Sequence, residues 1–163
     1  MGRKSIKENK SIYQLTREEL GLTREKAAEL IPGFSPERIE KLENGRVQIQ
    51  PEDVMLMAEY YKTPKLRNYY CCTECPIGQV LAPRIEDKDF VQITVETTNC
   101  LNKLNKYKDR LLEISEDNQI RPDEFDDFVE IKAMLDKLRL SIANLNMWFD
   151  EKIALGEIET DEK

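Results

Sequence analysis

With 163 residues the chain is long enough for one or two small domains with a modest core, and no apolar run is long enough to span a bilayer. The sequence contains no histidine, which is the commonest general base and metal ligand, and its formal net charge is −7. Residues 1–70 carry 13 basic and 11 acidic side chains, whereas residues 71–163 carry 12 and 21. This acidic second half argues against nucleic-acid binding there.

The N-terminal segment is basic but is not followed by the apolar stretch of a secretory signal. We therefore expect a cytoplasmic protein without membrane contact. Four cysteines in a reducing compartment are more typical of thiols or metal ligands than of a disulfide framework.

Residues 11–31 have the pattern of two short helices. Residues 11–20 place Ile12, Leu15 and Leu20 at near-helical spacing, which predicts that these side chains turn inward. Thr23 is a favourable N-cap for the second helix. The predicted inner face of that helix consists of Ala27, Ala28, Leu30 and Ile31.

A third helix is predicted between Ser35 and Gly45. Ser35 has the side chain of an N-cap, and Pro36 occupies the first helical position, where its missing N–H costs nothing. Ile39 and Leu42 are expected to point inward, and Asn-Gly ends the helix in a left-handed turn. A fourth helix opens at residue 51 and a fifth at residue 63. Together these elements predict a compact five-helix, all-α domain in residues 1–70.

Residues 71–83 combine cysteine, proline and glycine without a clear period, which predicts a linker. Cys72 and Cys75 have the spacing of a metal knuckle or a redox pair. A single C-x-x-C cannot complete a tetrahedral site, so Cys71, Cys100 or a pair from a second subunit would have to supply further ligands, and we expect no metal. Three readings remain open: apolar packing of the thiols, a metal bridged across a dimer, and a redox switch.

Residues 84–163 predict two long helices that form an antiparallel αα-hairpin. Apolar side chains alternate steps of three and four, as in a coiled coil. The first stripe consists of Phe90, Ile93, Thr97, Cys100, Leu104, Tyr107, Leu111 and Ile114. The second stripe consists of Phe128, Ile131, Leu135, Leu138, Ile142, Leu145 and Phe149. Each helix is expected to run for about 30 residues, and the short connection makes the two helices antiparallel neighbours.

Further apolar residues lie off the second stripe and would remain exposed on an isolated hairpin. They are Phe125, Val129, Met134, Leu140, Trp148 and Ile153. A second hairpin would cover them in a four-helix bundle, so we expect a homodimer through residues 84–163. The alternative is that they pack on the chain's own N-terminal domain.

No catalytic or cofactor motif is present in the sequence. It lacks a P-loop, a dinucleotide-binding fingerprint, a nucleophile elbow and a zinc-protease motif. The acidic cluster at residues 123–127 lacks the order of a calcium loop and is typical of a helix N-terminus. We expect neither catalytic residues nor a cofactor.

The stretches "LTREKAAELI" and "FSPERIEKLENGR", followed by "IQPEDVMLMAEYYKTP", carry a family resemblance. Over about residues 11–70 the chain resembles the helix-turn-helix domain of the phage-repressor (Cro/CI, XRE) family of transcriptional regulators. The most specific piece is "LENGR", Leu42 to Arg46. The resemblance implies binding to double-stranded DNA, with the second motif helix in the major groove.

The resemblance also implies a set of DNA-contacting residues, which are Thr23, Arg24, Ser35, Glu37, Arg38, Lys41, Asn44 and Arg46. In this set Arg38 would contact guanine and Glu37 would accept a hydrogen bond from cytosine N4. Glu43 matches a family glutamate that bonds within the domain. Glu40 departs from expectation, because a carboxylate that faces phosphates is repelled.

Two function hypotheses follow from these patterns. The first is a sequence-specific, DNA-binding transcriptional regulator that acts as a dimer on a near-palindromic operator. The alternative is a protein-interaction adaptor, in which the helix-turn-helix is a scaffold that does not bind DNA and the acidic hairpin binds a partner. The acidic side chains of the third helix favour the alternative.

Overall fold

The computed structural model describes residues 10–117 and 119–159. Within these ranges the chain is all-helical and contains no strand. The chain divides into two compact units, the first made of residues up to 82 and from 150 onward, and the second of residues 83–149. None of the helices in the described ranges is both long and apolar enough to cross a membrane.

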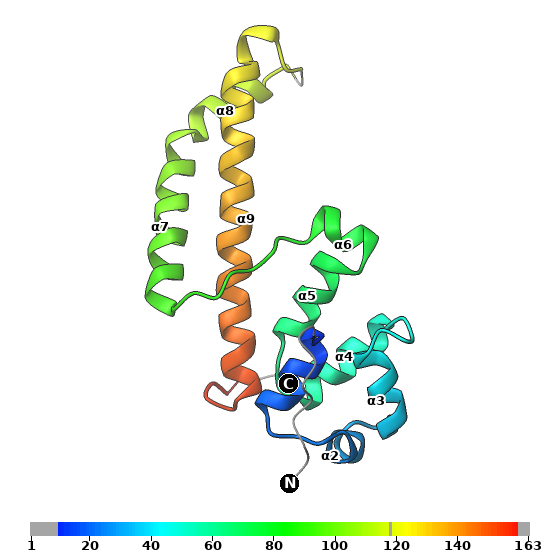
Figure 1. The fold of residues 1–163 in the computed structure, drawn as a ribbon. Coiled ribbons are helices and arrows are strands. Elements are labelled where there is room, and N and C mark those ends of the chain that lie inside the picture. The colour runs from blue at the N-terminus through cyan, green and yellow to red at the C-terminus, as the bar shows by residue number, and fades with distance from the viewer. Residues whose placement is uncertain (1–9, 118, 160–163) are drawn as a thin grey trace. The chain divides into compact units, whose positions relative to one another are not determined.

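The first unit contains six short helices, shown in blue to green in Figure 1. They are α1 (Ile12–Glu19), α2 (Arg24–Leu30), α3 (Pro36–Glu43), α4 (Pro51–Tyr60), α5 (Lys65–Thr73) and α6 (Pro76–Leu81). Helices α2 and α3 pack against each other, and α5 packs against both α4 and α6. The five helices predicted from the sequence are all present, and α6 is an addition to them.

Local side chains set the boundaries of these helices. Thr23 caps α2 by accepting a hydrogen bond from Lys26 N (3.3 Å), and Ser35 caps α3 by accepting one from Arg38 N (3.2 Å). Gly45 follows α3 with φ +65°, a conformation that glycine adopts without steric cost. The predicted caps and the predicted stop are therefore confirmed.

The core of the first unit is a single cluster that draws on all of its longer helices. It consists of Tyr13, Ala27, Ile31, Ile39, Leu42, Ile49, Val54, Met57, Ala58, Tyr61 and Leu66. The predicted inward positions of Ile39 and Leu42 are confirmed, since both are buried. Leu30, which was expected to face inward, is 41% exposed.

The predicted inner face of the first helix is confirmed only in part, at Ile12, which packs against the core. Leu15 and Leu20 are 39% and 47% exposed, whereas Gln14 and Arg17 are buried. The side chains of Gln14 and Arg17 form hydrogen bonds inside the unit, to Glu18 and Glu43. The aliphatic stem of the arginine also covers apolar surface. Hydrophobic periodicity cannot detect a buried face built from bonded polar residues.

Residues 71–82 are mostly helical, which corrects the expected irregular linker. Helix α5 continues to Thr73, and α6 follows after a short turn. The Sγ atom of Cys75 caps α6 by accepting a hydrogen bond from Gly78 N (3.4 Å). A Cβ atom on Gly78 would lie 2.3 Å from the carbonyl oxygen of Cys71, so the glycine allows α6 to approach α5 closely. Here the glycine marks a packing contact, although its residue type suggested a break.

The second unit is an antiparallel helical hairpin. It contains α7 (Phe90–Lys106), α8 (Lys108–Ser115), the 3-10 helix η1 (Pro122–Glu124) and α9 (Phe125–Ala154), whose last residues belong to the first unit. The contacts between the two arms step in opposite directions along the chain. They join Phe90 to Trp148, Cys100 to Ser141, Tyr107 to Glu130 and Arg110 to Asp127.

The first arm of the hairpin is broken, contrary to the expected single helix of about 30 residues. Helix α7 has 17 residues and α8 has 8, with Tyr107 between them at ψ −1°. Tyr107 N bonds to Leu104 O, an i→i−3 contact that tightens the helix end, and its hydroxyl donates to Glu130 across the hairpin. The 30 residues of α9 confirm the second predicted helix.

Candidate nucleic-acid interface

Helices α2 and α3, joined by a turn in which Gly33 has φ +78°, form a helix-turn-helix. The buried residues Ile39 and Leu42 fix which face of α3 is turned to solvent. Four of the residues expected to contact DNA, namely Ser35, Glu37, Arg38 and Lys41, are all exposed. The structure therefore places them on one accessible helix, as expected from the sequence.

Arg38 is held in place on two sides. Its Nη2 atom donates to Asp53 Oδ1 (2.6 Å), and its Cζ atom lies 5.2 Å from the centroid of the Phe34 ring. The Asp53 side chain is only 6% exposed and accepts a second hydrogen bond from Gln50 N at the start of α4. Because the Arg38 side chain is itself 51% exposed, its guanidinium is oriented yet remains accessible.

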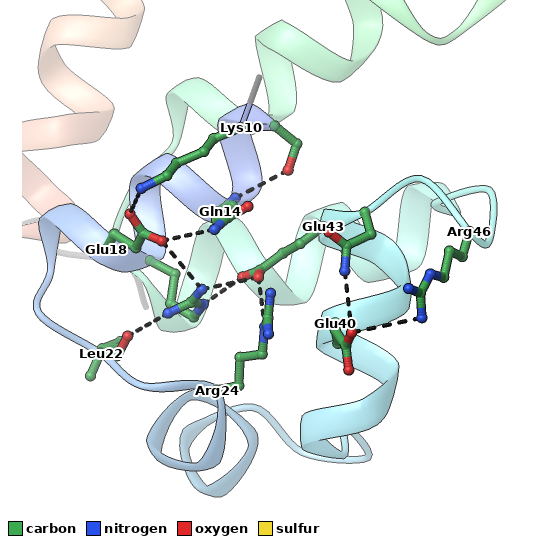
Figure 2. A network of polar contacts seen from close by, with 11 residues as sticks. Lys10, Gln14, Glu18, Leu22, Arg24, Glu40, Glu43 and Arg46 are labelled. Carbon is green, nitrogen blue, oxygen red and sulfur yellow. Dashed lines mark hydrogen bonds and ion pairs between the residues drawn. The ribbon is translucent and has the colours of Figure 1, made fainter. Parts of the chain in front are cut away.

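Glu43 lies at the centre of a buried ion network that joins three helices (Figure 2). Its side chain is fully buried and accepts from Arg17 Nη2 of α1 (3.0 Å) and from Arg24 Nε of α2 (2.9 Å). Arg17 also donates to Leu22 O (2.6 Å). The expectation that Glu43 bonds within the domain is confirmed.

This network restricts Arg24, which the resemblance assigns to DNA. Its side chain is 30% exposed, and its Nε atom is directed at Glu43 rather than at solvent. Burial raises the pKa of the nearby Tyr61 above its ordinary value, and the negative charge of Glu43 raises it further. The Tyr61 hydroxyl therefore stays neutral. The network thus fixes the angle between the two motif helices through one shared carboxylate.

Glu40, the unexplained acidic residue of α3, has local partners. Its Oε1 atom accepts from Asn44 Nδ2 (3.4 Å) and lies 3.7 Å from Arg46 Nη1 (Figure 2). Both members of the ion pair are exposed, at 42% for Glu40 and 67% for Arg46. Exposed pairs of this kind contribute about 0–1 kcal/mol, so little free energy is needed to separate them.

Carboxylates occupy the N-termini of both motif helices. The backbone N–H groups of Glu25 and Glu37 lower the pKa of their own side chains, and the hydroxyls of Thr23 and Ser35 add to the effect. These side chains are therefore charged at neutral pH. They compete with DNA phosphates for the positive helix ends, which weakens the phosphate contact expected at Thr23.

The motif surface is electrically balanced. Residues 24–46 contain five basic and five acidic side chains. Arg24, Arg38 and Arg46 each pair with a carboxylate, whereas Lys41 makes no ion pair within the described part of the chain. Binding to phosphates at this surface would therefore require rearranged ion pairs.

The cysteines do not gather into a ligand set. Cys72 Sγ lies 3.6 Å from Asn68 Oδ1, Cys75 caps α6, and Cys100 Sγ lies 3.8 Å from Ser141 Oγ. Among residues 10–117 and 119–159, no group of three or more cysteine, aspartate or glutamate side chains is arranged to hold a metal ion. All four cysteines are free thiols of intermediate burial.

Two residues important for this surface were missed by sequence reasoning. Arg17 lies 26 residues from its partner Glu43, and Asp53 lies 15 residues from Arg38. The only local signal was the place of Asp53 in the first turn of α4, which is typical of a capping residue. No local pattern indicates the partners across the fold.

Comparison with known proteins agrees with this geometry over part of the chain. A family model described as a helix-turn-helix domain matches residues 14–68, from within α1 to within α5. No curated protein and no solved structure matches the chain. From the family match and from the arrangement of α2 and α3, residues 14–68 form a helix-turn-helix domain.

Proposed function

We propose that the protein is a sequence-specific, DNA-binding transcriptional regulator of the phage-repressor (XRE) type, which acts as a homodimer. The observation that carries the proposal is the exposed Arg38, held by the buried carboxylate of Asp53. A pre-oriented guanidinium on an exposed helix loses little side-chain entropy when it forms a bidentate contact with guanine.

In this proposal α3 enters the major groove. Arg38 donates to guanine O6 and N7, and the adjacent Glu37 accepts from cytosine N4. Ser35 and Lys41 extend the contact along the same exposed face. Thr23 and Arg24 at the start of α2, together with Asn44 and Arg46 after α3, contact the DNA backbone and set the register.

The balanced charge of the motif surface supports binding that depends more on base contacts than on phosphates. Only a few phosphates would be neutralised, so the affinity should fall less steeply with salt than it does for a strongly basic motif. The pair between Glu40 and Arg46 would open on DNA, which makes the arginine available to a phosphate.

The proposed dimer presents two recognition helices to successive major grooves about one helical turn apart. The operator would then be near-palindromic, and regulation would follow from occupancy of a promoter without a catalytic step. The second unit would hold the subunits together.

The test is fluorescence anisotropy of the full chain against pools of short duplexes at several salt concentrations, with selection of the bound sequences. The variant Arg38→Ala with Lys41→Ala is compared with Lys106→Ala with Lys137→Ala, which removes the same charge from exposed positions of the hairpin. We expect the first variant to lose at least about tenfold in affinity and the second to change little. Circular dichroism checks that both remain folded.

A second candidate is a protein-interaction adaptor built on the same scaffold. The observation that favours it is the pairing of Arg24, Arg38 and Arg46 with carboxylates of the same unit. If no duplex binds even at low salt, the adaptor replaces the regulator. If the two double variants bind DNA equally well, the proposed contacts of Arg38 and Lys41 are wrong.

A further inference from the structure

One side of the hairpin carries a row of apolar side chains from each arm, several of which remain partly exposed. Three residues of α7, Phe90, Thr97 and Leu104, recur every seven positions. On α9 the same spacing gives Phe128, Leu135, Ile142 and Phe149. These seven residues are called the hairpin face. The exposed fraction is 37–43% for five of the seven, which are Phe90, Phe128, Leu135, Ile142 and Phe149.

Helical geometry places the two rows on the same side of the hairpin. Successive residues of a helix are rotated by about 100° around its axis. Taking the direction from the N- to the C-terminus as positive, the α7 row is displaced around the helix in the positive sense from the buried Ile93. The α9 row is rotated in the same sense from the buried Ile131. In an antiparallel pair, equal senses of rotation lead to the same face, so the two rows adjoin.

The opposite side of the hairpin is closed by polar contacts between its arms. Arg110 Nε donates to Asp127 Oδ2 (2.6 Å), and the Tyr107 hydroxyl donates to Glu130. The hairpin face has no charged member. The hairpin face is therefore an uncharged surface, and these two polar contacts between the arms lie outside it.

The exposed apolar area of the hairpin face is close to the apolar part of the surface that one partner buries in a standard protein interface. Five large side chains, each about two-fifths exposed, together present on the order of 400 Å² of apolar surface. A standard interface buries about 800 Å² per partner, of which somewhat more than half is apolar. The hairpin face would thus supply most of the apolar part of such an interface.

We propose that the hairpin face of one chain packs against the hairpin face of a second copy and closes a four-helix bundle. This rests on the proposed function, for which it supplies the dimer. An uncharged row with a seven-residue period fits a surface of the same period, because the side chains interdigitate as layers. A second copy of the chain carries the same surface, and a two-fold axis places the two hairpin faces against each other.

Of the residues expected to stay exposed beside the second stripe, Phe125, Val129 and Ile153 are exposed, whereas Met134 and Trp148 are not. Met134, which was expected to project from the stripe, is buried inside the hairpin, and Trp148 stacks on Phe90 with ring centroids 4.3 Å apart. Val129 is 65% exposed but lies outside the two rows. It therefore provides a control position on the same helix.

The experiment measures the mass of the full chain by sedimentation equilibrium in the absence of DNA. The face variant is Leu135→Glu with Ile142→Glu, and the matched control is Val129→Glu with Ala133→Glu, which adds the same charge to exposed positions of α9. We expect a wild-type dimer, a dissociation constant raised at least about 100-fold in the face variant, and a change of less than about threefold in the control.

A monomeric wild type at about 50 µM overturns the inference, and so does a face variant that dimerises as tightly as the control. If the glutamate variant loses its helical circular dichroism, Leu135→Gln with Ile142→Gln takes its place, with the same two criteria.

The two proposals fail separately. A duplex with a single half-site reports DNA binding by a monomeric face variant, whereas sedimentation reports the dimer without DNA. Half-site binding without a dimer contradicts the hairpin face and the homodimer, but it leaves DNA binding by α3 intact. A dimer that binds no duplex contradicts only the regulator.

Discussion

The helix-turn-helix unit and the hairpin bury their apolar side chains to different extents. In the described ranges the first unit encloses a cluster of eleven buried apolar residues, whereas the hairpin buries only Ile93, Ile114, Ile131 and Met134. Short helices that cross one another can surround a common core. Two long antiparallel helices share only one seam, so an apolar row beside that seam stays exposed.

The ion pairs that join different helices include a buried network in the first unit and an exposed pair in the hairpin. Glu43, at the centre of the first unit, has no exposed side-chain area. The hairpin pair between Arg110 and Asp127 is exposed at 35% and 44%. The first unit therefore depends on specific polar contacts for its stability, and the hairpin depends more on what packs against it.

The largest expected effect comes from Glu43→Ala, which removes the buried carboxylate shared by Arg17 and Arg24. We expect the free energy of unfolding of the first unit to fall by about 3–5 kcal/mol. Urea unfolding followed by circular dichroism measures it. The matched hairpin change, Asp127→Ala, should cost at most about 1 kcal/mol because that pair is exposed. Equal losses for the two variants would abolish the distinction between the units.

The second largest effect is expected from protein concentration, which should change the thermal stability of the hairpin but not that of the first unit. If a second copy covers the hairpin face, raising the concentration about 100-fold stabilises the hairpin by about 2.7 kcal/mol per mole of dimer formed. The first unit has its own core and should keep its melting temperature. Calorimetry at both concentrations, with the Leu135→Glu and Ile142→Glu variant as control, measures this. Two transitions that shift equally would contradict the comparison.

A smaller effect is expected for Asp53→Asn. The asparagine Oδ1 can still accept from Gln50 N at the start of α4, but the charge that orients Arg38 is removed. We expect a three- to tenfold loss in preference for guanine at the contacted position, equivalent to about 1 kcal/mol, with little change in unfolding. Anisotropy on paired duplexes that differ in this base provides the measurement. An unchanged preference would show that Asp53 has no orienting role.

The smallest expected effect is that of Glu40→Gln. The change removes a negative charge from α3 and abolishes the ion pair with Arg46. Both effects favour the approach of DNA phosphates. We expect DNA affinity to rise about two- to fivefold and the salt dependence to steepen slightly. The hairpin variant Glu130→Gln removes the same charge away from α3 and should leave affinity unchanged. A gain in both variants would point to net charge rather than to the motif.

The sequence was sufficient where the physics is local. Ser35 and Thr23 cap helices because their hydroxyls reach N–H groups three residues on, and Gly45 ends α3 because it tolerates a positive φ. Ile39 and Leu42 face inward because helical periodicity separates apolar from polar positions. The helix boundaries, the inward face of α3 and the long second arm of the hairpin were predictable on these grounds, whereas the DNA-contacting roles came from the family resemblance.

Only the tertiary structure decided which polar groups meet. Arg17 is buried because Glu43 lies across the core from it, and Arg38 is oriented because α4 brings Asp53 beside α3. Gly78 permits a helix contact that its residue type did not indicate. Such contacts join positions far apart in the chain, and their free energy depends on burial and geometry, which no local pattern of hydrophobicity records.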